Sequence, residues 1–273
     1  MNSEKSVPRM PVLFIGHGSP MNVIEDSPYR RAWQNLGAQF SSRWPKPKII
    51  LCISAHWLTE GWWLTGMQQP KTIHDFGGFP QALFEQQYPA PGAPAWAERL
   101  SQLLHQPHNG QPLGLDLTQW GLDHGAWSVL KPMFPAADIP VVQLSIDYHR
   151  PPAEHFALGQ QLRSLRDEGV LILASGNTVH NLRTMNRSAK DNEAFEWAIA
   201  FDQWVAEQIT SGHLDELVDF HAQGDTAKLS HPSYEHFLPL LYAAGAADAG
   251  ESVTFFNEGY QLASIAMRSV IWA

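Results

Sequence analysis

Histidines follow three short apolar runs of this chain, each within a few residues of the point where the run ends. His17 follows residues 11–15, His56 follows residues 49–53, and His180 follows residues 170–174. Short apolar runs bounded by Gly and Pro are typical of buried parallel strands. Open α/β sheets bind ligands beyond the carboxyl ends of such strands. Three imidazoles at one end of one sheet are therefore able to converge on a metal ion, and we take this as the leading hypothesis.

Two further histidines have neighbours that suit a functional site. His124 lies between Asp123 and Gly125, and His236 lies next to Glu235 on a helix predicted over residues 233–244. Glycines on both sides of His17 let backbone and ligand approach closely, although a tight turn with an incidental histidine is the alternative there. The remaining histidines have polar or helical neighbours: we expect solvated side chains at His105, His108, His149, His155, His213 and His221, and a helix-capping role for His231.

The composition is that of a compact globular protein. Of 273 residues, 44% are hydrophobic and 16% charged, and the formal net charge is −9. A nucleic-acid partner would need a basic face, which this charge argues against. No stretch approaches the roughly 18 apolar residues of a membrane helix, and the polar first ten residues do not resemble a signal peptide. Cys52 is the only cysteine, so no internal disulfide can form. We expect a cytoplasmic protein, a monomer or small homo-oligomer.

Strand and helix signals alternate along most of the chain, which predicts one α/β domain with a central, mostly parallel sheet flanked by helices. We expect an N-terminal tail over residues 1–10 and a catalytic domain over residues 11–273. A Pro-, Gly- and aromatic-rich loop is predicted over residues 70–94, and loops of that length are usually functional. Further helices are predicted over residues 28–40, 95–105, 125–133, 151–168 and 191–209, and further strands over 63–67, 139–146, 252–256 and 261–271.

Several common functional motifs are absent from the sequence. It contains no Cys-x-x-Cys, no His-Glu-x-x-His and no Gly-x-Gly-x-x-Gly, so structural zinc, zincin protease and dinucleotide-binding interpretations lack their signatures. The Gly18-Ser19 pair does not form the Gly-x-Ser-x-Gly of a hydrolase nucleophile elbow. Imidazole ligands without thiolates suit Zn, Fe, Cu or Ni and do not select among them.

Six motifs, in order along nearly the whole chain, resemble the class III extradiol ring-cleavage dioxygenases, and most closely the 4,5-DOPA-dioxygenase-like branch. They are Gly16-His17-Gly18-Ser19-Pro20-Met21, Ser54-Ala55-His56-Trp57, the stretch from Ile73 to Pro80, the stretch from Trp120 to Gly125, Ala174-Ser175-Gly176-Asn177 with His180-Asn181, and the stretch from Glu235 to Leu240. Six motifs in the right order are much more specific than any one of them.

The resemblance implies a mononuclear non-haem metal site. Its direct ligands carry over onto His17, His56 and His236. His180 carries over onto a position that is either a fourth ligand or the acid/base residue, and His124 onto a second active-site histidine near substrate and O2. These two are the catalytic residues that the resemblance implies.

The metal itself is less clearly implied. The wider superfamily usually completes its site with a glutamate, whereas the matching position here is His236, and Glu235 would point elsewhere on a helix. An all-histidine site accepts Zn(II) readily, so we expect Zn(II) in the protein as isolated. Dioxygen chemistry requires Fe(II), because zinc has no redox role.

The implied reaction is extradiol cleavage of a catechol, such as DOPA, by O2. His180 would act as general base towards a catechol hydroxyl, His124 would donate a hydrogen bond or proton to the reacting oxygen, and the aromatic loop from His74 to Phe79 would wall the pocket. Arg183 is one candidate for holding a substrate carboxylate, with a surface salt bridge as its alternative. Two other functions stay open from the sequence, a zinc-dependent hydrolase that activates water and a non-catalytic metal-binding protein on the same scaffold.

Overall fold

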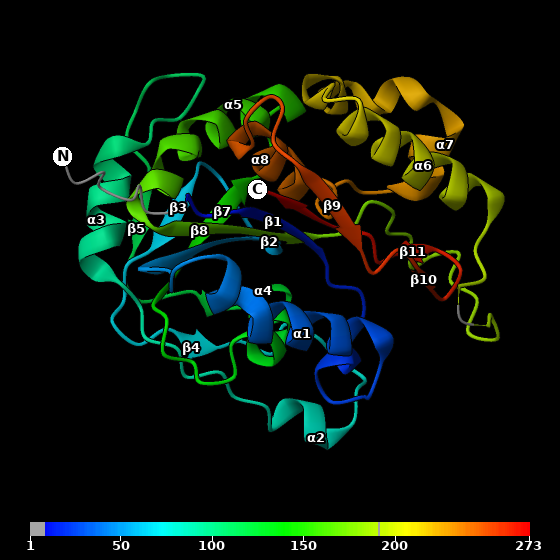
Figure 1. Cartoon of the computed structure of the whole chain (residues 1–273), viewed down its shortest axis with the longest axis horizontal. Helices are drawn as coiled ribbons and strands as arrows, with labels where there is room; N and C mark the ends of the chain where they lie inside the picture. The colour runs from blue at the N-terminus through cyan, green and yellow to red at the C-terminus, as the bar shows by residue number, and fades with distance from the viewer. Residues whose placement is uncertain (1–8, 191) are drawn as a thin grey trace.

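The computed structural model describes residues 9–190 and 192–273, and it is built on an eight-stranded sheet (Figure 1). The strand order is β5-β3-β7-β2-β8-β1-β12-β9. These strands are β1 (Val12–Gly16), β2 (Ile49–Thr59), β3 (Trp63–Thr65), β5 (Gly114–Asp116), β7 (Val141–Asp147), β8 (Val170–Gly176), β9 (Val253–Phe256) and β12 (Ser269–Trp272). Two small two-stranded sheets pair β4 (Lys71–Thr72) with β6 (Gly121–Leu122), and β10 (Tyr260–Gln261) with β11 (Ile265–Ala266).

The four strands at the centre of the sheet, β7, β2, β8 and β1, are parallel to one another. Towards the edges, β3 pairs antiparallel with β7, and β12 pairs antiparallel with both β1 and β9. The predicted fold class, one α/β domain with a mostly parallel sheet, is confirmed. Every residue of β1, β7 and β8 is buried, which explains why these strands read as continuous apolar runs in the sequence.

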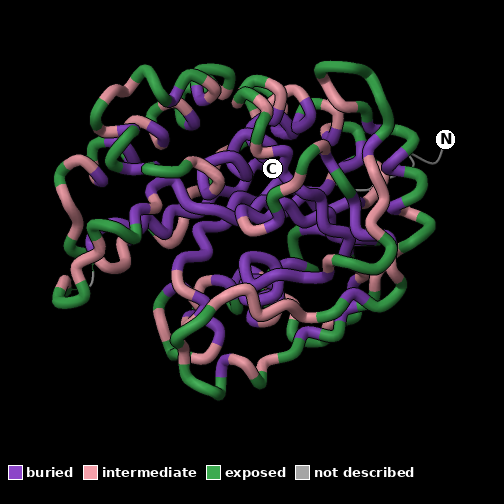
Figure 2. Tube along the Cα trace, turned by 180° about the vertical axis from the view of Figure 1, so that it is seen from behind, coloured by how far each residue is buried: buried purple, intermediate pink, exposed green. Residues whose placement is uncertain are grey.

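Helices cover both faces of the sheet (Figure 1). Two buried cores result, one on each face, because alternate residues of a strand point to opposite faces: Phe14 belongs to one core and Leu13 to the other. Figure 2 shows the buried chain running through the middle of the molecule. The helices are α1 (Pro28–Arg43), α2 (Gln81–Phe84), α3 (Pro94–Leu103), α4 (His124–Met133), α5 (Pro152–Leu162), α6 (Glu196–Thr210), α7 (Asp225–Ser230) and α8 (Leu238–Ala246), with 3-10 helices η1 (Pro20–Val23), η2 (Arg163–Glu168) and η3 (Leu214–Gln223).

Two helices begin later than predicted. The helix predicted over residues 191–209 starts at Glu196, and position 191 lies outside the described residues. The helix predicted from residue 233 starts at Leu238, so His236 lies in the turn before it. Two groups prevent an earlier start: Pro239 has no N–H to donate to an earlier carbonyl, and the carbonyl of His236 instead accepts the backbone N–H of Asn177, at 2.9 Å.

The prediction of a solvated His155 was wrong. This side chain has no exposed surface, because α5 packs against α8 and buries it between them. Its Nδ1 lies 2.7 Å from the hydroxyl of Tyr242, which in turn accepts a hydrogen bond from Nε1 of Trp62 at 2.7 Å. His231 is also buried, and its Nε2 donates to the carbonyl of Thr178. The other five histidines that were expected in solvent are exposed.

Candidate metal centre

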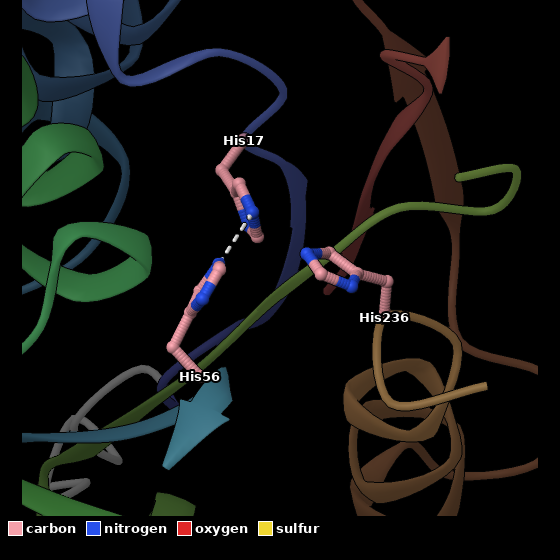
Figure 3. A group of neighbouring side chains, drawn as sticks. All are labelled: His17, His56 and His236. Carbon is pink, nitrogen blue, oxygen red and sulfur yellow. Dashed lines mark hydrogen bonds between the residues drawn. The ribbon is translucent and has the colours of Figure 1, made fainter. Parts of the chain in front are cut away.

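Three histidines from distant parts of the chain face one another near the carboxyl ends of the central strands (Figure 3). His17 directly follows β1, and His236 lies in the turn before α8. His56 belongs to β2, in the stretch between Ile53 and Leu58 where the pairing with β7 shifts register. One nitrogen from each of the three rings lies within 4.8 Å of the others. His17 and His56, which the sequence places near the ends of two strands, therefore lie next to each other in the fold.

The hydrogen bond of His17 fixes which of its nitrogens faces the other two rings. Its Nδ1 lies 3.0 Å from Oγ of Ser175, and that hydroxyl donates its own hydrogen to the carbonyl of Gly125, at 2.6 Å. The serine oxygen can therefore only accept from His17, so Nδ1 carries the hydrogen. Nε2 is left with a free lone pair, which is the form that a metal ligand needs.

Carboxylates do the same for the other two rings. Nδ1 of His56 lies 3.3 Å from Oδ2 of Asp75, and Nδ1 of His236 lies 3.1 Å from Oε1 of Glu235. An ionised carboxylate only accepts hydrogen bonds. The hydrogen bond to Glu235 places the hydrogen of His236 on Nδ1, and the nearby Asp75 carboxylate favours the same form at His56, so that each ring presents Nε2 as a lone pair. The helix expected over this turn does not form there, and Glu235 contacts the ring of His236 through Nδ1 without joining the group of His17, His56 and His236.

The three Nε2 lone pairs fit a bound cation. Nε2 of His236 is buried without a hydrogen-bond partner, and Nε2 of His17 lies 3.2 Å from Nε2 of His56, the contact drawn as a dashed line in Figure 3. Burial, reinforced by the neighbouring imidazoles, holds the pKa of each of the three well below its usual value. Neutral imidazoles with converging lone pairs are the donor set of a Zn or Fe site.

His180 lies beside this group of three. Its ring stacks on that of His236 with 3.5 Å between centroids and 7° between planes. Imidazole lone pairs lie in the ring plane, so two rings stacked in this way cannot aim at one common ion. Burial, together with His231 and His124, lowers the pKa of His180 to about 3. The ring is therefore neutral near pH 7.

His124 lies on the other side of the group, as the first residue of α4. Its ring centroid is 3.9 Å from that of His56, and its Nδ1 is 3.0 Å from Oδ2 of Asp75. Burial alone would raise the pKa of Asp75, but the adjacent His124 and His56 lower it to about 2. Asp75 was given no role from the sequence, where it was only one residue of the aromatic loop.

A cavity of about 930 Å³ opens over all five histidines. Phe76 and Phe79 line it, as expected of the predicted pocket wall, whereas His74 turns away and hydrogen-bonds the carbonyl of Gln86. Arg183, the sequence candidate for a substrate carboxylate, is not among the lining residues. Among the described residues, the lysine and arginine side chains that line the cavity are Arg187 and Lys190. Nothing in the sequence patterns distinguished these two from other surface cations.

Comparison with known proteins gives matches along nearly the whole chain. The family model described as the catalytic LigB subunit of aromatic ring-opening dioxygenase matches residues 11–267. The chain is 50% identical over 266 residues to the 4,5-DOPA dioxygenase extradiol of Escherichia coli strain K12, covering 96% of this chain and 94% of that protein. It is 41% identical over 261 residues to the 4,5-DOPA dioxygenase extradiol of Beta vulgaris, with 95% and 94% covered.

A solved structure agrees with the sequence matches. The crystal structure of an uncharacterized protein from Escherichia coli K12 has a TM-score of 0.81 and 43% identity, and the match covers 97% of this chain and 100% of that one. No helix among the described residues is long and apolar enough to cross a membrane. The resemblance drawn from the six motifs is confirmed, and the chain belongs to the family of the catalytic LigB subunit of aromatic ring-opening dioxygenases.

Proposed function

We propose that this protein is an extradiol dioxygenase that opens the ring of a DOPA-like catechol with O2 at a mononuclear metal. The observation that carries the proposal is the convergence of three imidazole nitrogens in a cavity that two further histidines also line. The relatives named 4,5-DOPA dioxygenase extradiol support the same reaction for this chain.

His17, His56 and His236 would hold the metal. Bound Fe(II) would supply the one-electron chemistry that lets O2 react with a catechol, which Zn(II) does not supply. We propose Fe(II) for the active enzyme and Zn(II) as the metal that this all-imidazole site readily takes up on isolation. The stacking of His180 on His236 supports the acid/base role of His180 over a role as a fourth ligand.

The chain's own residues would then prepare the substrate. His180 lines the cavity beside His236 and would take a proton from a catechol hydroxyl. His124 lines the same cavity and, as an imidazolium with Nδ1 towards Asp75, would donate a hydrogen bond or proton from Nε2 to the reacting oxygen. Phe76, which contacts the ring of His124 edge to face, offers an aromatic wall to the catechol ring. Both atoms of O2 enter the product, a ring-opened semialdehyde acid.

The substrate side chain would meet two cationic side chains that line the cavity. Arg187 and Lys190 come from the segment that follows His180, and both are exposed at the cavity lining. Two cations suit a carboxylate, which the amino-acid side chain of DOPA carries. This supports a carboxylated catechol as substrate in preference to catechol itself.

The test is reconstitution without oxygen, with Fe(II) in one sample and Zn(II) in another. On addition of air and L-DOPA, we expect oxygen uptake and a new yellow chromophore in the iron sample alone. His180→Ala should retain the metal and lose turnover. Activity in the zinc sample without oxygen uptake would instead indicate a hydrolase, and a filled iron site without turnover of L-DOPA, catechol, protocatechuate or caffeate would indicate a binding protein.

A further inference from the structure

One carboxylate, that of Asp75, contacts two of the five histidines at once. Its Oδ2 lies 3.3 Å from Nδ1 of His56 and 3.0 Å from Nδ1 of His124, while its Oδ1 accepts the backbone N–H of His124 at 2.9 Å. Asp75 lies on the loop between β4 and α2, and its side chain is 17% exposed. The loop is thereby attached both to β2, through His56, and to the first residue of α4.

The backbone N–H of His124 donates to Asp75, and Nδ1 of His56 and Nδ1 of His124 both lie within ion-pair distance of its Oδ2. A carboxylate offers only acceptors, so it favours the hydrogen of each ring on Nδ1. The hydrogen of His56 is held on Nδ1, so its Nε2 stays a lone pair towards His17. The ring of His124 is held against the ring of His56, with 3.9 Å between centroids. We propose that Asp75 is a positioning residue, whose single carboxylate sets both the ligand form of His56 and the place of His124. This inference rests on the metal role proposed above for His56.

Glu235 provides a matched control, because it pairs with one imidazole, that of His236, while the nearest nitrogen of His180 is within 4.8 Å of its carboxylate without a hydrogen bond. Its Oε1 faces Nδ1 of His236 and also accepts from the hydroxyl of Ser233 at 3.1 Å. In Glu235→Gln the amide oxygen can take the place of Oε1, so the hydrogen stays on Nδ1 of His236. The substitution removes a charge but leaves the ring in its ligand form.

Asp75→Asn cannot be accommodated in the same way. An amide has one oxygen and one NH2 group, and donors lie on both sides of this position. Either the NH2 faces the backbone N–H of His124, or it faces Nδ1 of both His56 and His124. In the second case those rings must move their hydrogens to Nε2, and His56 then presents N–H instead of a lone pair towards His17. Asp75→Ala leaves neither an acceptor nor a donor at this position, so it favours neither the Nδ1–H nor the Nε2–H form of His56.

The experiment measures zinc affinity by competition with a chelator, with no turnover involved. We expect Asp75→Asn to weaken zinc binding about 10–100-fold, the usual cost of losing a partner of a metal-bound histidine. Asp75→Ala should lose less than Asp75→Asn, and Glu235→Gln less again. Circular dichroism and thermal unfolding identify any variant that fails to fold. If Asp75→Asn does not fold, the test is the comparison of zinc affinity between Asp75→Ala and Glu235→Gln.

Nitrogen NMR of ¹⁵N-histidine protein, without metal, reads the hydrogen positions directly. We expect Nδ1–H at His56 in the wild type and in Glu235→Gln, and a shift to Nε2–H in Asp75→Asn. Wild-type affinity together with an unchanged His56 signal in Asp75→Asn would overturn the proposal. Two zinc ions per wild-type chain and one in Asp75→Asn would also overturn it, by making Asp75 a ligand. Because no catechol is used, failure of the proposed ring cleavage would leave these readouts interpretable.

Discussion

Removal of the two cations that line the cavity should weaken the enzyme's selection of carboxylated catechols. Arg187 and Lys190, from the segment after His180, both line the cavity. L-DOPA and dopamine carry the same catechol ring and the same amine, and only L-DOPA carries a carboxylate. If the cations bind that carboxylate, Arg187→Ala and Lys190→Ala should raise KM for L-DOPA and leave dopamine almost unaffected.

The expected size follows from the exposure of both side chains. Solvent screens exposed ion pairs, which are worth about 0.2–1 kcal/mol each. At about 1.4 kcal/mol per factor of ten, each single variant should lose no more than about fivefold in kcat/KM for L-DOPA, and the double variant no more than about 30-fold. kcat should change little, since neither cation bonds to an imidazole of the site.

Oxygen uptake by the iron-loaded protein measures both substrates under identical conditions. Arg183→Ala is the matched control, because it removes an exposed cation of the same segment that does not line the cavity. Equal losses for L-DOPA and dopamine would refute the reasoning, since they would show that the variants disturb the site in general. An unchanged ratio of the two kcat/KM values in the double variant would refute it as well.

Three other predictions concern the metal and the core. The double variant His17→Ala/His56→Ala should fold and lose stoichiometric metal, measured by elemental analysis; full retention would contradict the ligand assignment. Tyr242→Phe leaves no cavity but removes the buried partner of both Trp62 and His155. At about 1–3 kcal/mol for each of these two buried polar groups left unsatisfied, urea unfolding should show a loss of about 2–6 kcal/mol. Burial lowers the pKa of His155 to about 4 and that of His231 to about 4, so the unfolded chain binds these protons first. With the other histidines that burial keeps neutral, they should make the metal-free protein fully stable above about pH 6.5 and less stable as the pH drops towards 4. A flat profile would show that these histidines are not buried in neutral form.

The sheet could be predicted because its strands are buried on both faces. The runs that became β1, β2 and β8 are apolar throughout, and parallel strands place their carboxyl ends along one edge. From that rule alone, the sequence predicts that His17 and His56 lie close together. His236 was assigned only through the resemblance to a family, because it lies in a turn whose start is set by a hydrogen bond to Asn177, far away in the chain.

The residues that orient the histidines could not be predicted. Asp75 and Glu235 contact the histidines at about 3 Å, and these contacts depend on how the loop before α2 and the turn before α8 pack against the sheet. Local sequence carries no signal for such contacts, since acidic residues beside histidines are common on solvated surfaces. The same holds for His155, whose burial depends on the partner helix and not on its own neighbours in the sequence.

Two of the three histidines that face one another are far apart in the chain, His17 just after the first strand and His236 just before the last helix. A metal held by both would close almost the entire polypeptide into a loop, as a cross-link does. Such a bond restricts the unfolded chain and adds its binding free energy to folding, about 4 kcal/mol when free metal exceeds Kd a thousandfold. The melting temperature should therefore rise with the concentration of free metal, and a cell short of metal would hold a protein that is easier to unfold and degrade, as well as one without its reactive centre.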